Sequence, residues 1–268
     1  MRRLHIFELH DHDWFPDTWR DLFTDALSFF EASMDLYAPA ARLLELVIDG
    51  EDFVIVDLCS GAGQPVVTAV AALGDDIAGR VRVVLTDKYP NVASLERLSK
   101  ESGGLDVSYV ETPVDALSVP DDLTGFRTLF SSLHHFDEDS ARAILEDAVA
   151  KRRGIAVFEF TDRRLLPRLL VYWLPFLVRL LVKTPSIVPF RRKRILLTYL
   201  VPVIPVVLCW DGVVSCLRSY SEDDLRGLVA RLGDDDYSWR VGTVRSTGPF
   251  RVTYLIGQPQ AGPAAATR

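Results

Sequence analysis

Three aspartates stand where three neighbouring strands are expected to end, and together they could bind a ligand rich in hydrogen-bond donors. Asp57 falls near the end of the apolar run FVIVDL, Asp87 ends RVRVVLTD, and Asp115 follows DVSYVET within PVDAL. Carboxylates at these places can accept hydrogen bonds from an ammonium group, from sugar hydroxyls and from an exocyclic amine. Ligands of parallel sheets bind at the carboxyl ends of the strands, so the three side chains are expected to share one rim.

The turn after the first strand, DLCSGAG, is built from small residues that let the backbone bend sharply and a ligand approach closely. Gly61 and Gly63 match the start of the dinucleotide fingerprint G-x-G-x-x-G, but no third glycine follows in QPVVT. Asp57 would repel a pyrophosphate, whereas it suits a ligand that carries an ammonium group. The helix expected over 64–74 offers free N–H groups to a negative group such as a carboxylate.

A pair of histidines in SSLHHFDED supplies candidate acid–base chemistry. His134 and His135 close the strand expected over 127–133, and an unperturbed imidazole titrates near neutrality, so either could take a proton from a hydroxyl or an amine. The alternative is structural, with the pair capping the next helix and packing against the sheet. Glu159 is expected to be buried inside the strand at 155–160, and it therefore needs a polar partner.

Strands and helices alternate along most of the chain. Short, apolar, β-branched runs predict five strands, at 53–58, 80–87, 106–112, 127–133 and 155–160. Helices are expected over 17–48 with a break at Pro39, and over 64–74, 91–104, 137–154 and 221–233. The alternation implies right-handed crossovers and a parallel sheet covered by helices on both faces. Two last runs, SWRVGTVRS and FRVTYLIGQ, predict a hairpin at one edge, with one strand antiparallel to the rest.

This combination of motifs resembles the class I S-adenosylmethionine-dependent methyltransferases over roughly residues 40–258, and among them uncharacterised bacterial small-molecule methyltransferases. The resemblance implies a Rossmann-like, doubly wound α/β fold: a seven-stranded sheet, mostly parallel, with a C-terminal antiparallel hairpin, N-terminal helices and a helical lid insertion. It implies S-adenosyl-L-methionine as the cofactor, with Asp57 near the methionine amino group, Asp87 at the ribose diol and Asp115 at the adenine amine.

By the same resemblance, Gly61 and Gly63 would cradle the methionine portion of the cofactor. The remaining cofactor contacts that it implies come from Leu58, Cys59, Ser60, Lys88, Ala116 and Ser131. Cys59 departs from the family pattern, because it stands where the family usually has its first glycine. That position must therefore tolerate a Cβ atom.

Between Arg163 and Trp210 there are nine basic residues and no acid, although the whole chain carries a net charge of −7. Two uncharged runs in this segment, of 10 and 16 residues, are shorter than the roughly 20 residues needed to span a bilayer, and Pro202 and Pro205 interrupt the second. Three interpretations remain open: a lid around an apolar substrate, contact with an anionic membrane through RRKR, or a homodimer interface. The residues expected to contact the substrate are Trp14, Phe15, Tyr172, Trp173, Tyr199, Arg218 and Tyr220.

Composition limits the classes of function. The acidic net charge argues against general nucleic-acid binding, and three scattered cysteines do not form a disulfide framework or a zinc site. The N-terminal stretch lacks the apolar region of a signal peptide, so a cytoplasmic location is expected, with peripheral membrane contact as an alternative. No metal site is expected at HDHDWFP, because alternating His and Asp on a short segment do not easily converge on one ion.

The sequence therefore predicts one methyltransferase domain over 1–258, with a helical cap at 1–48, a lid at 163–220 and a disordered tail at 259–268. The expected reaction is methyl transfer from S-adenosylmethionine to the oxygen or nitrogen of a small, apolar molecule. A nicotinamide oxidoreductase is one rival, although it would need the missing third glycine. The other rival is a membrane-surface protein of the same fold that acts on a lipid or binds without catalysis.

Overall fold

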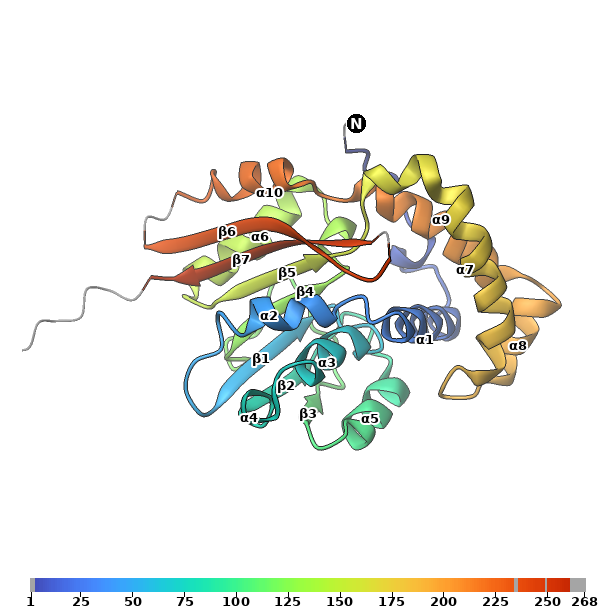
Figure 1. The fold of residues 1–268 in the computed structure, drawn as a ribbon, viewed down its shortest axis with the longest axis horizontal. Helices are drawn as coiled ribbons and strands as arrows, with labels where there is room; N and C mark the ends of the chain where they lie inside the picture. Colours follow the sequence, from blue (N-terminus) through green and yellow to red (C-terminus); the bar gives the residue numbers. More distant parts are fainter. Residues whose placement is uncertain (1–2, 234–235, 249, 261–268) are drawn as a thin grey trace, which may run out of the picture.

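A computed structural model describes residues 3–233, 236–248 and 250–260, except for the side chains of residues 165 and 168–173. A seven-stranded sheet forms its centre, with the strand order β3-β2-β1-β4-β5-β7-β6 (Figure 1). The strands are β1 (Phe53–Leu58), β2 (Val81–Leu85), β3 (Asp106–Tyr109), β4 (Phe126–Phe130), β5 (Ile155–Glu159), β6 (Tyr237–Arg245) and β7 (Arg251–Pro259).

Parallel pairing joins β1 to β2 and β4 and continues to β3 and β5, whereas β7 runs antiparallel to both β5 and β6. The predicted mostly parallel sheet with a C-terminal antiparallel hairpin is therefore confirmed. From β1 the chain builds the sheet first toward β3 and then, in the opposite direction, from β4 outward. This reversal leaves a crevice at the carboxyl ends of β1 and β4, which is where ligands bind in open α/β sheets.

Neighbouring side chains of the central strands face two separate hydrophobic clusters, because successive residues of a strand point to opposite faces. Ile55 packs among residues of α3 and α5, whereas Val56 packs among residues of α6 and α10. A strand covered on both faces must be apolar along its whole length, and FVIVDL nearly is. The helices around the sheet are α2 (Ala41–Leu44), α3 (Gln64–Ala71), α4 (Asp75–Ala78), α5 (Val92–Glu101), α6 (Glu138–Ala150) and α10 (Glu222–Val229).

A third hydrophobic cluster joins the N-terminal helix α1 (Asp17–Ser33) to the insertion. Phe23 and Phe30 of α1 pack in it with Leu180 and Leu208. Figure 1 shows α1, α7, α8 and α9 gathered at the end of the sheet where the parallel strands finish. The elements of the insertion are η4 (Arg163–Arg168), α7 (Leu169–Lys183), η5 (Thr184–Ser186), α8 (Arg192–Tyr199) and α9 (Val203–Arg218). The short 3₁₀ turns outside it are η1 (Leu9–Asp11), η2 (Ala38–Ala40), which contains Pro39, and η3 (Leu133–His135).

The basic stretch RRKR is only partly exposed. Arg191 Nε and Arg194 Nη1 lie 3.1 and 3.0 Å from Asp25 Oδ2, so two of its guanidinium groups are bound inside the protein. Arg192 and Lys193 are exposed. Membrane contact through RRKR and homodimer formation stay predictions.

The outer surface of the insertion is apolar as well as basic. Exposed side chains on it include Leu174, Val182, Phe190, Leu200 and Val206. Over the described residues, no single helix has the length and apolar character that crossing a bilayer requires. The consecutive helices α8 and α9 would meet that requirement only together, and they are bent by 74° relative to one another.

The C-terminal boundary lies slightly later than predicted. Strand β7 continues to Pro259, and the Gln260 N–H donates to the Asp236 carbonyl at 2.7 Å, so residues 259 and 260 belong to the ordered sheet edge and not to the tail. The rest of the predicted disordered tail, 261–268, lies outside the described residues.

Candidate active site

Two cavities meet beneath α1 and the insertion. The first, the strand-end cleft, has a volume of about 290 Å³ and lies at the carboxyl ends of β1, β2 and β4. The second, the apolar cavity, has a volume of about 160 Å³ and is lined by side chains from α1, α7 and α9, among them Phe30, Phe176 and Leu208. Both cavities are lined by His10, Phe23, Leu27, Glu31, Ser131 and His135. Molecules bound in the two cavities would therefore meet at these shared residues.

Most of the cofactor residues that the sequence predicts do line the strand-end cleft. They are Cys59, Ser60, Gly61, Asp87, Lys88 and Ser131. The turn itself shows why its residues are small. Gly63 has φ +79°, and a Cβ atom there would lie 2.7 Å from Leu85 Cδ1 and 2.9 Å from Leu98 Cδ2, so a side chain would strain the backbone and require both leucines to shift.

Cys59 occupies a backbone conformation that glycine usually takes. Its φ is +57°, in the left-handed region that non-glycine residues seldom adopt. The departure from the family pattern is therefore confined to the side chain, because the backbone keeps the bend for which a glycine would serve. Gly61 has the same φ of +57°, and a Cβ atom there would make an ordinary van der Waals contact with Thr24 at 3.8 Å, so glycine is favoured there by the backbone conformation.

Asp57 lies beneath the turn and does not line the cleft. Its carboxylate accepts hydrogen bonds from Ser60 Oγ at 2.7 Å and Thr128 Oγ1 at 2.6 Å. Burial raises the pKa of Asp57 to about 7, although these two hydrogen bonds oppose the shift. The side chain therefore fixes the glycine turn against β4, and a contact to the methionine amino group, if present, would have to pass through the turn.

Asp87 joins the glycine turn after β1 to the turn after β2. Its two carboxylate oxygens accept hydrogen bonds from the Gly61 and Tyr89 N–H groups, both at 2.7 Å. Asp115 lies at the rim: its side chain is 40% exposed, and Oδ2 is 3.6 Å from Lys88 Nζ. Of the three aspartates, Asp87 alone lines the strand-end cleft, while Asp115, Ala116 and Leu58 lie outside its lining.

His134 is buried and paired with Glu159. Its Nδ1 lies 2.7 Å from Glu159 Oε2, which supplies the partner that a buried acid in β5 requires. Burial acts to raise the pKa of Glu159, but the charge and hydrogen bonds of His134 outweigh it and lower the pKa. The helix cap expected as the structural alternative is made by Asp137, whose side chain accepts from the Ser140 N–H. The imidazole of His134 lines the apolar cavity.

His135 faces the N-terminal segment. Its Nδ1 lies 2.8 Å from Asp11 Oδ1 and 3.3 Å from Glu8 Oε2. Burial alone would lower the pKa of His135, but the carboxylates of Asp11 and Glu8 outweigh it and raise the pKa to about 9. Glu8, His10 and Asp11 are thus parts of the site that the sequence prediction missed. The only signal was their position within ELHDHD, and their partners lie more than 100 residues away.

Arg218 connects the N-terminal segment to the turn that contains His134 and His135. It is 2% exposed, and it donates from Nε to the His134 carbonyl at 3.0 Å and from Nη2 to the His135 carbonyl. Its Nη1 lies 2.6 Å from Asp11 Oδ2. The predicted substrate contact of Arg218 is replaced by this structural role, because the guanidinium lines neither cavity.

Of the other aromatic residues predicted to contact the substrate, the four whose side chains the structure describes line neither of the two cavities. Trp14 is 65% exposed, Phe15 is buried in the cluster between α1 and the insertion, and the exposed Tyr199 donates its hydroxyl to the Leu181 carbonyl. Tyr220 packs near α6 and α10 beneath the guanidinium of Arg3. The side chains of Tyr172 and Trp173 lie outside the described part of the chain.

Glu31 is another buried acid of the site, and the sequence analysis did not single it out. Its side chain lines both cavities, and its Oε1 has no hydrogen-bond partner. Burial, reinforced by the nearby charge of Glu159, raises the pKa of Glu31 to about 8. At neutral pH this carboxyl therefore holds a proton that it can donate to a bound molecule.

Comparison with known proteins identifies the fold. No family model and no curated protein matches the sequence. An O-methyltransferase family protein from Burkholderia thailandensis superposes with a TM-score of 0.53, at 17% identity over 95% of this chain and 62% of its own. The mitomycin 7-O-methyltransferase MmcR superposes with a TM-score of 0.51, at 17% identity over 94% of this chain and 60% of its own.

The chain has the class I methyltransferase fold. The strand order and the C-terminal hairpin agree with this fold, as the sequence resemblance implied. The chain spans about three fifths of the length of these two methyltransferases. The strand-end cleft lies between β1 and β4, where the strand order reverses.

The raised pKa of Glu31 predicts how the free energy of unfolding depends on pH. Between the ordinary pKa of 4.5 and the folded value of about 8, the folded protein holds a proton that the unfolded chain releases. Stability therefore falls as the pH rises through this window, by at most about 1.4 kcal/mol per pH unit. We expect Glu31→Gln to remove this dependence, so that urea unfolding at pH 5.5 and 7.5 shows the variant gaining about 2 kcal/mol relative to the wild type.

The exposed Glu45, in the segment that follows α2, provides the matched control. Glu45→Gln should leave the difference from wild type constant between the two pH values. An equal effect of Glu31→Gln at pH 5.5 and 7.5 would show that Glu31 is ionised throughout, and that it cannot donate a proton in hydrogen bonds at neutral pH.

Proposed function

We propose that this protein transfers a methyl group from S-adenosyl-L-methionine to a small, apolar molecule through an oxygen or nitrogen acceptor. The observation that carries the proposal is the junction of the two cavities, where the strand-end cleft and the apolar cavity share the lining residues Ser131 and His135. Donor and acceptor can approach each other there while water is kept away by α1 and the insertion.

The residues of the strand-end cleft fit the proposed cofactor. Gly61 lines the cleft and has no side chain, so a ligand can approach its backbone closely, as the resemblance requires for the methionine portion. Asp87 lines the cleft with a carboxylate that already accepts two N–H groups, and its remaining lone pairs can accept from ribose hydroxyls. Lys88 and Asp115 stand together at the rim, where the adenine would lie. When bound there, S-adenosylmethionine supplies an activated methyl group on its sulfonium.

The apolar cavity determines the proposed class of acceptor. Phe23, Leu27, Phe30 and Phe176 surround a space that favours an uncharged, aromatic or aliphatic molecule. Glu31 adds one protonated carboxyl to this lining, which can donate a hydrogen bond to a polar group of the substrate. The substrate that fits is thus largely apolar, with a polar acceptor group directed toward the strand-end cleft.

His134 is the proposed general base. Because its Nδ1 is held by Glu159, the Nδ1–H tautomer is favoured, which leaves Nε2, 3.7 Å from Glu8 Oε1, to accept a proton. Glu159 acts as a positioning residue that fixes the orientation of the ring. Attack by the acceptor forms the new bond to the methyl carbon while the carbon–sulfur bond breaks, its electron pair passes to sulfur, and the acceptor proton passes to His134.

The role of Asp87 can be tested without a substrate. We expect Asp87→Ala to weaken S-adenosylmethionine binding at least tenfold in titration calorimetry, because it removes a charged acceptor worth about 1.5–3 kcal/mol. Asp106→Asn is the matched control, because Asp106 is an exposed acid at the start of β3, at the opposite end of the sheet. Wild-type protein that binds NADH and not S-adenosylmethionine would instead support the oxidoreductase rival.

A test of the roles of His134 and Glu159 requires an assay of methyl transfer. With methyl-labelled S-adenosylmethionine and a panel of small phenols and aryl amines, we expect His134→Gln to lower kcat by about 10²–10⁴-fold while cofactor affinity stays unchanged. Glu159→Gln should lower kcat less, because it keeps the ring in place and loses only the charge. His5→Gln is the control, because His5 is exposed and lines neither cavity. Full activity of His134→Gln would contradict the proposed base.

A further inference from the structure

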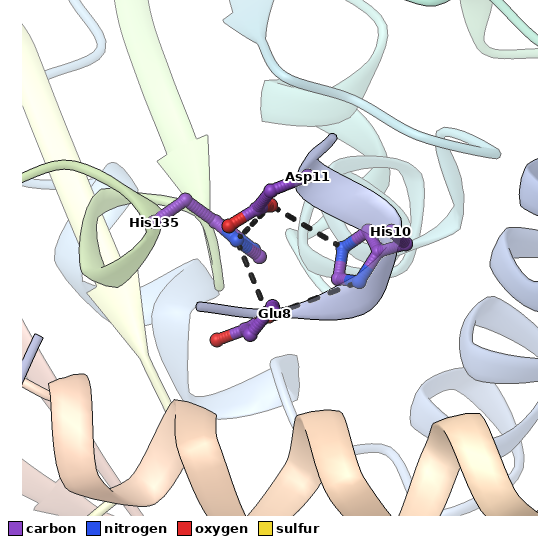
Figure 2. Close-up of side chains that lie close together, drawn as sticks. All are labelled: Glu8, His10, Asp11 and His135. Carbon is purple, nitrogen blue, oxygen red and sulfur yellow. Dashed lines mark ion pairs between the residues drawn. The ribbon is translucent and has the colours of Figure 1, made fainter. Parts of the chain in front are cut away.

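Four side chains at the junction of the two cavities point toward one another, as Figure 2 shows. Glu8, His10 and Asp11 come from the N-terminal segment around η1, and His135 comes from η3 after β4. One ligand atom from each of the four lies within 4.8 Å of every other. Of the stretch HDHDWFP, only His10 and Asp11 belong to this group, and Glu8 and His135 complete it from outside that stretch.

The separations suit a cation at the centre of the group. Asp11 Oδ1 and Glu8 Oε2 lie 2.8 and 3.3 Å from His135 Nδ1, and His10 Nε2 lies 3.8 Å from Asp11 Oδ1. Two ligand atoms bound to one cation at about 2.1 Å are about 3.0–3.4 Å apart at angles between 90° and 109°. The four side chains need only small adjustments to surround one ion.

Buried polar atoms aimed into the group have no hydrogen-bond partner. Glu8 is fully buried, and its Oε2 makes no hydrogen bond. His135 Nδ1 is within ion-pair distance of Asp11 but makes no aligned hydrogen bond. These two atoms face each other at 3.3 Å as an ion pair without a hydrogen bond, and a bound cation would give each of them a direct ligand bond.

The surroundings hold the four ligands in the orientation that a metal site requires. His10 Nδ1 lies 2.7 Å from Asp211 Oδ2, which leaves Nε2 free to face the group. Arg218 engages Asp11 Oδ2, and Ser215 Oγ donates to Glu8 Oε1 at 3.1 Å, so the other oxygen of each carboxylate points inward. A carboxylate behind a metal-binding histidine and fixed carboxylates are the usual supports of protein metal sites.

We propose that Glu8, His10, Asp11 and His135 bind one divalent first-row transition-metal cation. Two imidazoles and two carboxylates favour a cation of the Mn²⁺, Fe²⁺, Co²⁺ or Zn²⁺ type over Ca²⁺, which prefers an all-oxygen site. His10 and His135 line both cavities, so the cation lies where donor and acceptor would meet.

This placement gives the cation a catalytic role, and that role rests on the proposed function. A cation at the junction can take a hydroxyl oxygen of the substrate as a further ligand and favour loss of its proton to His134. The acceptor is then a hydroxyl group, not an amine. Methyl transfer to that oxygen needs no oxidant or further reactant.

Metal binding can be measured with neither cofactor nor substrate. The full-length protein is dialysed against EDTA and then titrated with Mn²⁺, with free Mn²⁺ followed by electron paramagnetic resonance. We expect one equivalent to bind, and we expect Glu8→Gln and His135→Gln each to weaken binding at least tenfold. His12→Gln is the matched control, since His12 belongs to the same segment but stacks on Trp14 outside the group.

Three outcomes would overturn the site: no binding at millimolar Mn²⁺, unchanged binding in both variants, or equal loss in His12→Gln. Each would leave the group as an ion-pair cluster only. If the variants fail to fold, anomalous diffraction from wild-type crystals soaked in Mn²⁺ decides, with a peak among the four side chains expected and a peak elsewhere contradicting the site.

The catalytic part is tested separately from the proposed function. Methyl transfer to a hydroxyl substrate should fall at least tenfold after EDTA treatment and return with Mn²⁺. Transfer that continues unchanged in EDTA would contradict the role of the cation while leaving the methyltransferase proposal intact. The Mn²⁺ titration would still test the metal site in that case. If methyl transfer is absent under every condition, this result counts against the proposed function itself.

Discussion

The buried guanidinium of Arg218 is the interaction on which the site depends. It stands at the end of α9 and binds the backbone carbonyls after β4 and the carboxylate of Asp11 in the N-terminal segment. Three parts of the chain that are far apart in sequence are thereby fixed against one another. A buried charge of this kind is tolerated only when its partners are in place, so its presence ties the closure of the insertion to the arrangement of the histidines.

The sheet forms one cavity of the site, and α1 with the insertion forms the other. The reversal of strand order opens the strand-end cleft, and Asp57 and Asp87 fix its turns through hydrogen bonds to Ser60, Thr128, Gly61 and Tyr89. The insertion and α1 build the apolar cavity through their own hydrophobic cluster. The chemistry proposed for this protein requires both, because an uncharged acceptor must be desolvated beside a charged donor.

The sheet could be predicted from the sequence because each central strand is a short apolar, β-branched run that ends at a polar residue or a turn. The glycine turn could be placed for the same reason, and even the unusual Cys59 keeps the backbone bend expected there. The substrate side chains could not be predicted, because α7 and α9 are apolar around most of their surface and give no pattern that marks the inward face. Residue type alone favours Trp14 and Tyr199, whereas Phe23, Phe30 and Phe176 line the cavity. The polar group around His135 was missed because its members meet only through long-range contacts.

The central claim is that the reactive end of a methyl donor bound in the strand-end cleft faces the apolar cavity. A crystal structure with S-adenosylhomocysteine, the demethylated cofactor, tests this claim most directly. We predict its sulfur atom at the junction formed by Glu31, Ser131 and His135, with the ribose beside Asp87. An empty cleft in the presence of saturating ligand, or a sulfur atom directed away from that junction, would contradict the account.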